Sequence, residues 1–331
     1  MPVLSFVRCL SFSMLPLLAL GLMPMAQAQQ KWPSKPIRIF TSTSGGPYDV
    51  VMRATGVPLA QALGEPVIVE NRTGGSFVPV ADGCAKSAPD GHSLCALDAF
   101  MMSVNPLMIA NIPYNAEKDF TPIIYIGALN SGLMVNAELP VKDLPDLLAQ
   151  ARANPGKFTF ATAGTGTSAN LYVEYLRKEK GIAFLNVPYK SFPLGMNAAA
   201  AGEVNAAMFG LAGALNMARS GKVRVIATSA PRRSIFAPDL PTFAEGGIDV
   251  AMNTWIGMLG PAGLPREVVS RLNSEYKKIL ADPVMMEKYV KGQGFEPTPP
   301  SGGSPEEFAS FIKADQAAYA RAVKIVGIKP E

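Results

Sequence analysis

The chain has 331 residues, 48% of them hydrophobic and 17% charged, with a formal net charge of +4. A chain of this length usually divides its core between two domains, and the lack of a Lys/Arg run excludes a basic nucleic-acid-binding surface. The single histidine, His92, excludes a metal site built from several histidines and catalysis that needs several imidazole bases. We therefore expect no metal and no cofactor.

The N-terminal 28 residues have the pattern of a secretory signal peptide. Arg8 precedes an apolar stretch at residues 15–25, and Ala26-Gln27-Ala28 follows as a small-residue cleavage site. The apolar stretch is interrupted by prolines and is too short to span a membrane. The expected mature chain begins at Gln29 in the periplasm, and an uncleaved anchor is the alternative.

Short β-rich segments alternate with amphipathic ones through the rest of the chain, which predicts an α/β protein with helices on both faces of parallel sheets. The expected strands are residues 37–40, 67–70, 93–97, 123–127, 133–135, 158–161, 206–209 and 223–228. The expected helices are residues 50–63, 144–153, 171–180, 266–280 and 305–323. The last helix has the clearest start, because Ser304 suits the N-cap, Pro305 the first helical position, and two glutamates the first turn.

Two of the predicted strand-to-helix connections are rich in glycine and hydroxyl side chains. They are Thr41-Ser42-Thr43-Ser44-Gly45-Gly46-Pro47-Tyr48-Asp49 and Thr162-Ala163-Gly164-Thr165-Gly166-Thr167-Ser168-Ala169-Asn170. Glycines let backbone N–H groups approach a ligand, hydroxyls add donors, and a helix N-terminus adds partial positive charge. Neither loop contains Lys or Arg, so together they predict a cradle for a carboxylate that must be released again. Ordinary turns of the same composition are the alternative.

Two substitutions follow from this hypothesis. Replacing Gly166 with valine should block the approach of the amides and abolish binding without disturbing the fold. Asp49 suits a helix cap better than a ligand contact, because it would repel an anion, so Asp49→Asn should be mild.

The usual catalytic motifs are missing. There is no Cys-x-x-Cys, Gly-x-Ser-x-Gly, His-Glu-x-x-His or Walker A motif, and Gly164-Thr165-Gly166 lacks the third glycine of a dinucleotide fingerprint. We expect a binding protein and not an enzyme. Ser168 or Ser191 with Lys190 leaves a Ser/Lys enzyme open, which turnover of a substrate would reveal. A structural or adhesive domain would need no such loops.

Of the three cysteines, Cys9 lies in the predicted signal peptide, so Cys84 and Cys95 are the two that would reach an oxidising compartment. They flank a turn at Pro89-Asp90-Gly91. A disulfide between them and a pair of buried thiols both stay open, because connectivity depends on geometry.

A series of short motifs runs in order through the mature chain. They are Trp32-Pro33-Ser34-Lys35-Pro36-Ile37-Arg38, Gly45-Gly46 with Asp49 and Arg53, Val69-Glu70-Asn71-Arg72 ahead of Gly74-Gly75, Ala88-Pro89-Asp90-Gly91, Asn105-Pro106, Lys118-Asp119-Phe120, Asn154-Pro155-Gly156-Lys157, Val187-Pro188-Tyr189-Lys190, Leu240-Pro241-Thr242, Trp255-Ile256-Gly257 and Pro261-Ala262-Gly263. Through these motifs the chain resembles the tripartite tricarboxylate transporter substrate-binding proteins, the Bug family of periplasmic receptors.

This resemblance implies a type II periplasmic-binding-protein fold, a Venus flytrap of two α/β domains with mixed or parallel sheets and two crossover segments. By analogy, residues 29–129 and 255–331 form domain I, residues 130–254 form domain II, and the ligand lies in the cleft between them. The expected protein is a monomer that captures a carboxylate by domain closure and delivers it to the large and small subunits of a membrane permease. A signalling partner stays open as the alternative.

The resemblance also implies which residues contact the ligand. The two glycine-containing loops would hold its carboxylate, and a third loop after the strand at residues 93–97 would face the cleft. The expected ligand-binding residues are Thr43, Ser44, Gly45, Gly46, Tyr48, Asp98, Ala99, Phe100, Ala163, Gly164, Thr165, Gly166, Thr167, Ser168, Tyr189, Lys190, Phe192 and Gly210.

Three departures from the family pattern fall where specificity should lie. The first loop has hydroxyls in place of the usual prolines before Gly-Gly, with Pro47-Tyr48 after it, and Ser191-Phe192-Pro193 replaces a glycine after Lys190. Gly210 stands where relatives often have an aspartate that can meet a ligand amine, which argues against an amino acid ligand. Tyr48, Phe100 and Phe192 are suited to stacking on a flat ligand, so aliphatic di- or tricarboxylates and aromatic carboxylates both stay open.

Overall fold

The computed structural model describes residues 32–42, 44–162, 164, 167–250, 252–328 and 330. The predicted signal peptide lies outside the described residues. Within the described part of the chain, no helix is both long enough and apolar enough to cross a bilayer.

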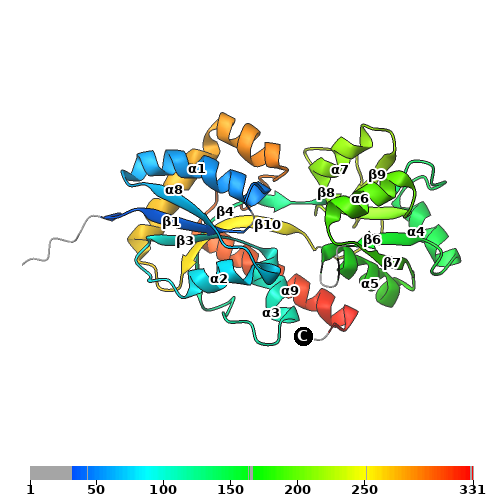
Figure 1. Ribbon diagram of the computed structural model, residues 1–331, viewed down its shortest axis with the longest axis horizontal. Coiled ribbons are helices and arrows are strands. Elements are labelled where there is room, and N and C mark those ends of the chain that lie inside the picture. The colour runs from blue at the N-terminus through cyan, green and yellow to red at the C-terminus, as the bar shows by residue number, and fades with distance from the viewer. Residues whose placement is uncertain are drawn as a thin grey trace, which may run out of the picture. The chain divides into compact units, whose positions relative to one another are not determined.

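The first of two five-stranded sheets has the strand order β2-β1-β3-β10-β4 (Figure 1). Its strands are β1 (Ile37–Thr41), β2 (Val67–Asn71), β3 (Ser93–Asp98), β4 (Phe120–Leu129) and β10 (Thr254–Pro261). Strand β1 is parallel to β2 and β3, whereas β10 is antiparallel to β3 and β4. The helices in contact with this sheet are α1 (Pro47–Leu63), α2 (Val78–Ala85), α8 (Arg266–Ala281) and α9 (Pro305–Val326).

The second sheet has the order β7-β6-β8-β5-β9. Its strands are β5 (Ser131–Asn136), β6 (Thr159–Thr162), β7 (Leu185–Pro188), β8 (Ala206–Gly210) and β9 (Val223–Thr228). Strand β6 is parallel to β7 and β8, and β5 is antiparallel to β8 and β9. Its helices are α4 (Leu144–Ala153), α5 (Ser168–Lys180), α6 (Phe192–Ala201) and α7 (Leu211–Ala218). The chain is therefore a two-domain α/β protein with mixed sheets, as predicted.

The chain passes between the two sheets at two places. Only Asn130 separates β4 from β5, and the return lies between Thr228 of β9 and Thr254 of β10. The two passages are hydrogen-bonded to each other, because the amide of Ser131, directly after Asn130, donates to Ser229 Oγ at 2.8 Å. Within the return passage, Asn253 Nδ2 donates to the Ser229 carbonyl at 2.8 Å. The domain boundaries at residues 129/130 and 254/255 remain a prediction.

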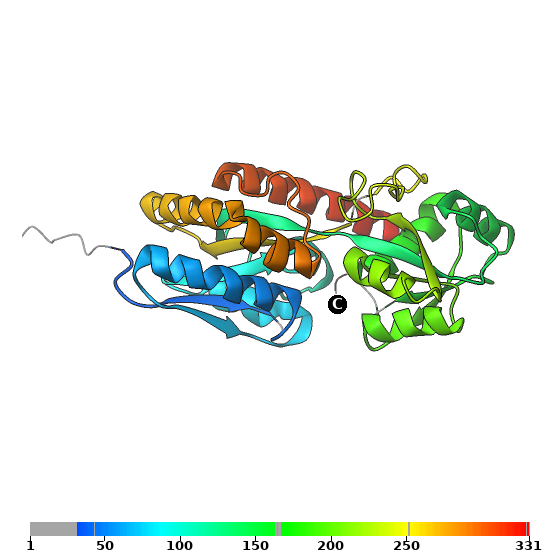
Figure 2. The same ribbon diagram turned by 90° about the horizontal axis from the view of Figure 1, so that it is seen from above.

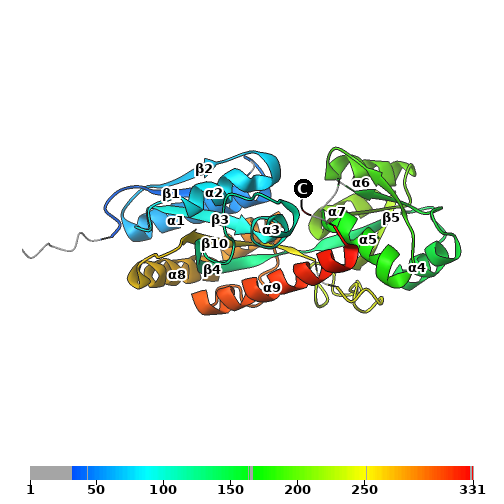
Figure 3. The same ribbon diagram turned by 90° about the horizontal axis from the view of Figure 1, so that it is seen from below.

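Helix α9 packs against both α5 and strand β4 (Figures 2 and 3). Its start is fixed by a capping box in which Ser304 accepts from the Glu307 amide and Glu307 accepts from the Ser304 amide, which confirms the predicted N-cap. Along its buried face, Phe308 meets the Trp255 ring edge to face at 5.4 Å between centroids. Aromatic packing of this kind joins β10 and α9 into one rigid core.

Most predicted elements are confirmed within a few residues, and the helix at 144–153 agrees at both ends. Strands β7 and β10 were missed, as were α2, α6 and α7. Strand β10 contains Gly257 and Gly260 and ends at Pro261, which lowers its β-propensity. Helices α6 and α7 are rich in alanine and interrupted by glycine, so they lack the polar stripe that marks an amphipathic helix.

Cys84 of α2 and Cys95 of β3 form a disulfide, with their Cα atoms 6.0 Å apart. Both residues are fully buried. The bond ties α2 to the centre of the first sheet and settles the choice that the sequence left open.

Replacing both cysteines with alanine should lower the free energy of unfolding by about 3 kcal/mol, because the cross-link closes a short loop in the unfolded chain. Urea denaturation of the double variant against the oxidised protein measures this difference. An equal midpoint for the two proteins, with no free thiol detected in the oxidised one, would contradict the stabilising role.

Candidate functional site

The first glycine-rich loop connects β1 to α1. Gly46 is the N-cap of α1, has no side-chain cap, and is followed by Pro47 at the first helical position. Gly45 has φ +72°, which favours glycine, and a Cβ there would meet open space. The loop therefore presents the N-terminus of α1 to its surroundings. Thr43 lies outside the described residues, and Ser44 is exposed.

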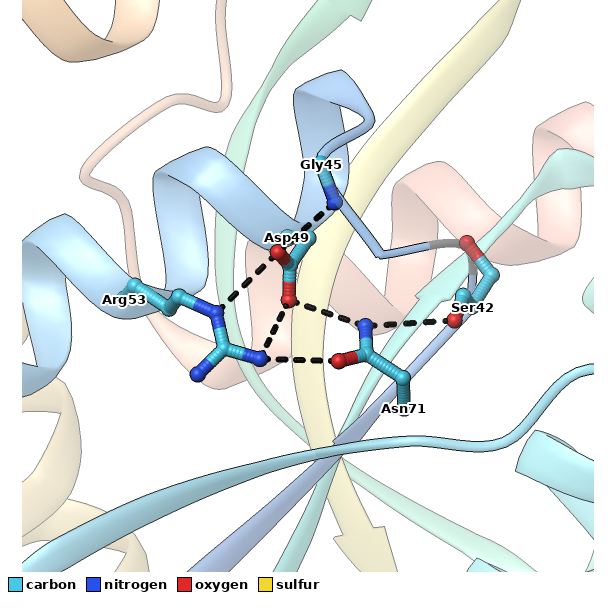
Figure 4. A network of polar contacts seen from close by, with 5 residues as sticks. All are labelled: Ser42, Gly45, Asp49, Arg53 and Asn71. Atoms are coloured by element: carbon cyan, nitrogen blue, oxygen red, sulfur yellow. Dashed lines mark hydrogen bonds and ion pairs between the residues drawn. The ribbon is translucent and has the colours of Figure 1, made fainter.

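A hydrogen-bond network centred on the buried carboxylate of Asp49 holds this loop from behind (Figure 4). The Gly45 amide donates to Oδ2 at 2.9 Å, Arg53 Nε donates to the same oxygen at 3.0 Å, and Asn71 Nδ2 donates to Oδ1 at 2.8 Å. Arg53 Nη2 also donates to Asn71 Oδ1 at 2.8 Å, and Asn71 Nδ2 reaches the Ser42 carbonyl at 3.3 Å. We call these five residues the Asp49 network.

The Asp49 network fixes the charge of its carboxylate. Burial opposes ionisation, but the hydrogen bonds from Arg53, Gly45 and Asn71 outweigh it and hold the pKa of Asp49 below its usual value. The stabilisation that this provides is present above the ordinary pKa of 3.8 and is lost as the pH falls below it. Asp49 therefore does more than cap α1, and the mild effect of Asp49→Asn on ligand binding stays a prediction.

The second glycine-rich loop connects β6 to α5, and Ala163, Thr165 and Gly166 lie outside the described residues. Of the rest, Gly164 has φ +98°, and its carbonyl accepts from Thr167 Oγ1 at 2.8 Å. Thr167 is the N-cap of α5 and accepts from the Asn170 amide, while Ser168 is the first helical residue. Two glycine- and hydroxyl-containing connections thus lead into helix N-termini, one in each domain, as the sequence indicated.

The segment predicted as a third loop is not a loop. Asp98 ends β3, and Phe100 begins a π-helix at Phe100–Val104. Asp98 and Ala99 are buried, and Phe100 is half-buried against the core. The Asp98 carboxylate accepts from the Met101 amide at 3.0 Å and from the Tyr48 hydroxyl. This carboxylate closes the start of the π-helix.

Tyr48 is packed into the first domain. Its hydroxyl lies 3.2 Å from Thr254 Oγ1, at the start of β10, and its ring meets Phe295 edge to face at 5.5 Å. Burial raises the pKa of Tyr48 well above its usual value, with the Asp98 charge adding to the effect. Tyr48 therefore links the first loop to the point where the chain returns from the second domain.

The remaining predicted site residues lie on the second domain. Tyr189 is half-buried and follows β7, and Lys190 is exposed. Phe192 is the first residue of α6. Gly210 ends β8 and is the N-cap of α7, with φ −50°, and a Cβ added there would meet open space. Space is therefore available where relatives often have an aspartate.

Sequence reasoning missed the structural partners of the first loop. Arg53 and Asn71 appear in the motifs that carry the family resemblance. The i,i+4 spacing of Asp49 and Arg53 was a signal for their contact, whereas nothing in the sequence indicates that Asn71 reaches Asp49. It also missed Asn130, whose side-chain oxygen and nitrogen are buried without a hydrogen-bond partner among the described residues. A short polar segment, Asn130-Ser131, between two predicted strands was the signal that could have found it.

The described residues give little support to a Ser/Lys catalytic pair. Lys190 is exposed, and no contact joins it to another described side chain, whereas a lysine that acts as a base usually has its pKa lowered by burial. Ser168 is already part of α5. What the arrangement offers chemically is a set of neutral donors at two helix N-termini.

A two-domain α/β chain with mixed sheets and two connecting passages has the fold of the periplasmic solute-binding proteins. A solved structure described as a periplasmic transporter is 32% identical, covers 90% of this chain and 99% of its own, and has a TM-score of 0.74. Rpa4515 of R. palustris, solved with adipate, is 27% identical, with coverage of 91% and 100% and a TM-score of 0.76. Among curated sequences, a UPF0065 protein from the tcbD-tcbE intergenic region of Pseudomonas sp. strain P51 is 32% identical over 88% of this chain and 86% of its own.

The family described as "Tripartite tricarboxylate transporter family receptor" matches residues 51–328. This chain belongs to that family, as its motifs indicated.

Replacing Asp49 with asparagine should lower the free energy of unfolding by about 1–3 kcal/mol, because an amide nitrogen would face donors of Arg53 and Asn71 that need an acceptor. Asp146 offers a matched control, since it also occupies the third position of a helix and accepts the amide four residues earlier, at 2.8 Å. Asp146 has no arginine partner, so Asp146→Asn should lower the free energy of unfolding by less than Asp49→Asn. Urea denaturation of both variants measures the two losses in free energy of unfolding. Equal losses would contradict a special stabilising role of the Asp49 network.

Proposed function

We propose that this protein is a periplasmic receptor that binds a small carboxylate between its two domains, closes around it, delivers it to a membrane permease and performs no chemistry on it. The observation that carries this proposal is the chemistry of the first loop. Its amides and hydroxyls are neutral donors, and the guanidinium of Arg53 is engaged by Asp49 behind the loop. Neutral dipoles bind an anion firmly enough to select it and loosely enough to release it.

The second loop completes the proposed site from the other domain. Thr167 and Ser168 stand at the N-terminus of α5 as Gly45 and Gly46 stand at that of α1. A ligand that bridges the two loops would stabilise a closed arrangement of the domains, because it binds that arrangement more tightly than one in which only a single loop is reached. The predicted signal peptide at residues 1–28 would direct the chain to the periplasm.

The packing of the aromatic side chains favours an aliphatic ligand over an aromatic one. The Tyr48 ring packs edge to face with Phe295, and its hydroxyl contacts Thr254. Phe100 packs against the core. Tyr48 and Phe100, two of the three residues whose rings were suited to stacking on a ligand, thus already pack within the first domain. The likeness to Rpa4515, which was solved with adipate, supports a dicarboxylate of similar kind.

A thermal-shift screen of the mature protein against malate, adipate, citrate and terephthalate tests the proposed function. A ligand that binds the folded state raises the melting temperature, and one present at 100 times its Kd stabilises by about 2.7 kcal/mol. We expect the largest rise with an aliphatic dicarboxylate, which mass spectrometry recovers unaltered. Turnover of the ligand would point to an enzyme, and no rise with any carboxylate, in protein freed of co-purified ligand, would contradict the proposal.

Gly210 provides a substitution that tests the position of the site. Gly210→Ala should be tolerated, because its Cβ meets open space at an ordinary φ. Gly210→Asp should weaken carboxylate binding about tenfold or more, because it places a negative charge beside the proposed anion site, and one factor of ten corresponds to about 1.4 kcal/mol. Gly210→Asn is the matched neutral control. Equal affinities of the Asp and Asn variants would place the anion elsewhere.

A further inference from the structure

Of two neighbouring carboxyl groups, Asp98 of β3 is buried and Asp315 of α9 is half-buried. Asp98 pairs with Ile256 of β10, the residue after Trp255, whose indole donates to Asp315, and the charge of Asp315 acts on Asp98. Asp98 is 2% exposed. Asp315 Oδ2 accepts from Trp255 Nε1 at 3.0 Å and from the Ser103 hydroxyl. We call Asp98 and Asp315 the acid pair.

The acid pair is connected to the proposed site on one side and to the returning strand on the other. The Tyr48 hydroxyl lies 3.2 Å from Thr254 Oγ1 and interacts electrostatically with Asp98, which pairs with Ile256 two residues further along β10. Tyr48 itself lies in the first turn of α1. Trp255, the partner of Asp315, is the next residue along β10. A change of charge on the pair therefore acts on the first loop and on the strand that joins the two domains.

The groups that face the acid pair are neutral near physiological pH. Four tyrosines from different elements share an electrostatic interaction with one or both carboxyls: Tyr48 of α1, Tyr114, Tyr125 of β4 and Tyr319 of α9. Burial raises the pKa of each of these phenols above its usual value. The contacting donors are hydroxyls, an indole and backbone amides, so no cation offsets the two carboxylates in these contacts.

Loss of solvent around the two carboxyl groups, with no cation of the described residues in contact, raises the pKa of both. Desolvation raises the pKa of Asp98 to about 6, against the hydrogen bonds from Met101 and Tyr48 and with help from the charge of Asp315. Desolvation likewise raises the pKa of Asp315 to about 6. Because both values exceed the ordinary 3.8, these groups add stability below that value and lose it as the pH rises through 6, which is the reverse of Asp49.

A partly open cavity of about 960 Å³ lies beside α9, and its lining includes Ser103, the donor to Asp315, and Gln316, the next residue along the helix. The charged side chains of this lining, Glu117, Lys118 and Lys313, are exposed. The half-buried Asp315 therefore lies next to a solvent-accessible cavity.

We propose that the acid pair takes up a proton when an anionic ligand binds to the first loop, so that affinity for carboxylates rises as the pH falls. This inference rests on the proposed function. A bound anion adds negative charge near Asp98, which favours the protonated form of the pair. By thermodynamic linkage, prior protonation of the pair then favours the anion to the same extent.

The first test follows the acid pair without any ligand. The chain has two tryptophans, so Trp32→Phe leaves Trp255 as the sole reporter, and its indole donates to Asp315. Fluorescence of this variant should change between pH 4.5 and 8 with a midpoint near 6. Asp315→Asn, which keeps an acceptor for Ser103 and Trp255, should abolish the transition, whereas Glu306→Gln, an exposed site on the same helix, should keep it. A flat titration, or an unchanged one in Asp315→Asn, would overturn the proposal.

The second test measures the linkage to ligand by titration calorimetry with adipate, malate, citrate and terephthalate at pH 6.5 and 8.0. If the bound anion raises the pKa of one carboxyl from about 6 to about 7, the Kd should be about threefold smaller at pH 6.5. Runs in phosphate and in Tris should show net proton uptake, which Asp98→Asn and Asp315→Asn should each reduce. Equal Kd values with no proton uptake would overturn the coupling alone, whereas no binding at either pH would overturn the proposed function with it.

Discussion

The structure of the first loop depends on one buried carboxylate. Asp49 is 3% exposed, and a buried charge must be paired and hydrogen-bonded to be tolerated. Its two oxygens draw the Gly45 amide, the Arg53 guanidinium and the Asn71 amide to one point, which joins the loop, α1 and β2. The same arrangement occupies the cation that would otherwise neutralise a bound anion. The loop is left with neutral donors held in fixed positions, and this explains a receptor better than it explains a catalyst.

Tyr48 extends this order from the loop to the connection between the domains. It follows Pro47 at the start of α1, packs on Phe295 and contacts Thr254 at the start of β10. If ligand binding moves the loop, the contact between Tyr48 and Thr254 therefore transmits this movement to the passage between the sheets. Asp98 and Asp315, which no cation among the described residues contacts, lie in the same region. In the proposed mechanism, ligand binding and protonation therefore act on one set of side chains at the connection between the domains.

The sequence predicted the fold class, most strands and the two glycine-rich connections, because these depend on local periodicity and turn chemistry. It did not predict β10, whose glycines leave room for neighbouring side chains: a Cβ at Gly257 would clash with Phe308, and one at Gly260 with Leu264. It also left open the pairing of Cys84 with Cys95, which a Cα separation of 6.0 Å allows. The i,i+4 spacing of Asp49 and Arg53 is a local pattern, but the contact of Asn71 with Asp49 joins residues far apart in the chain. The same holds for the interaction between Asp98 and Asp315, so no local pattern could show either of them.

The central claim is that a carboxylate is held by neutral donors of both glycine-rich loops. A crystal structure of the mature protein with its highest-affinity carboxylate tests this most directly. The account predicts that one ligand carboxylate lies within hydrogen-bond distance of donors from residues 42–49 and from residues 162–168, with Arg53 still bound to Asp49. A ligand held by Lys190 or Arg53, or one seated in the cavity beside α9, would contradict it.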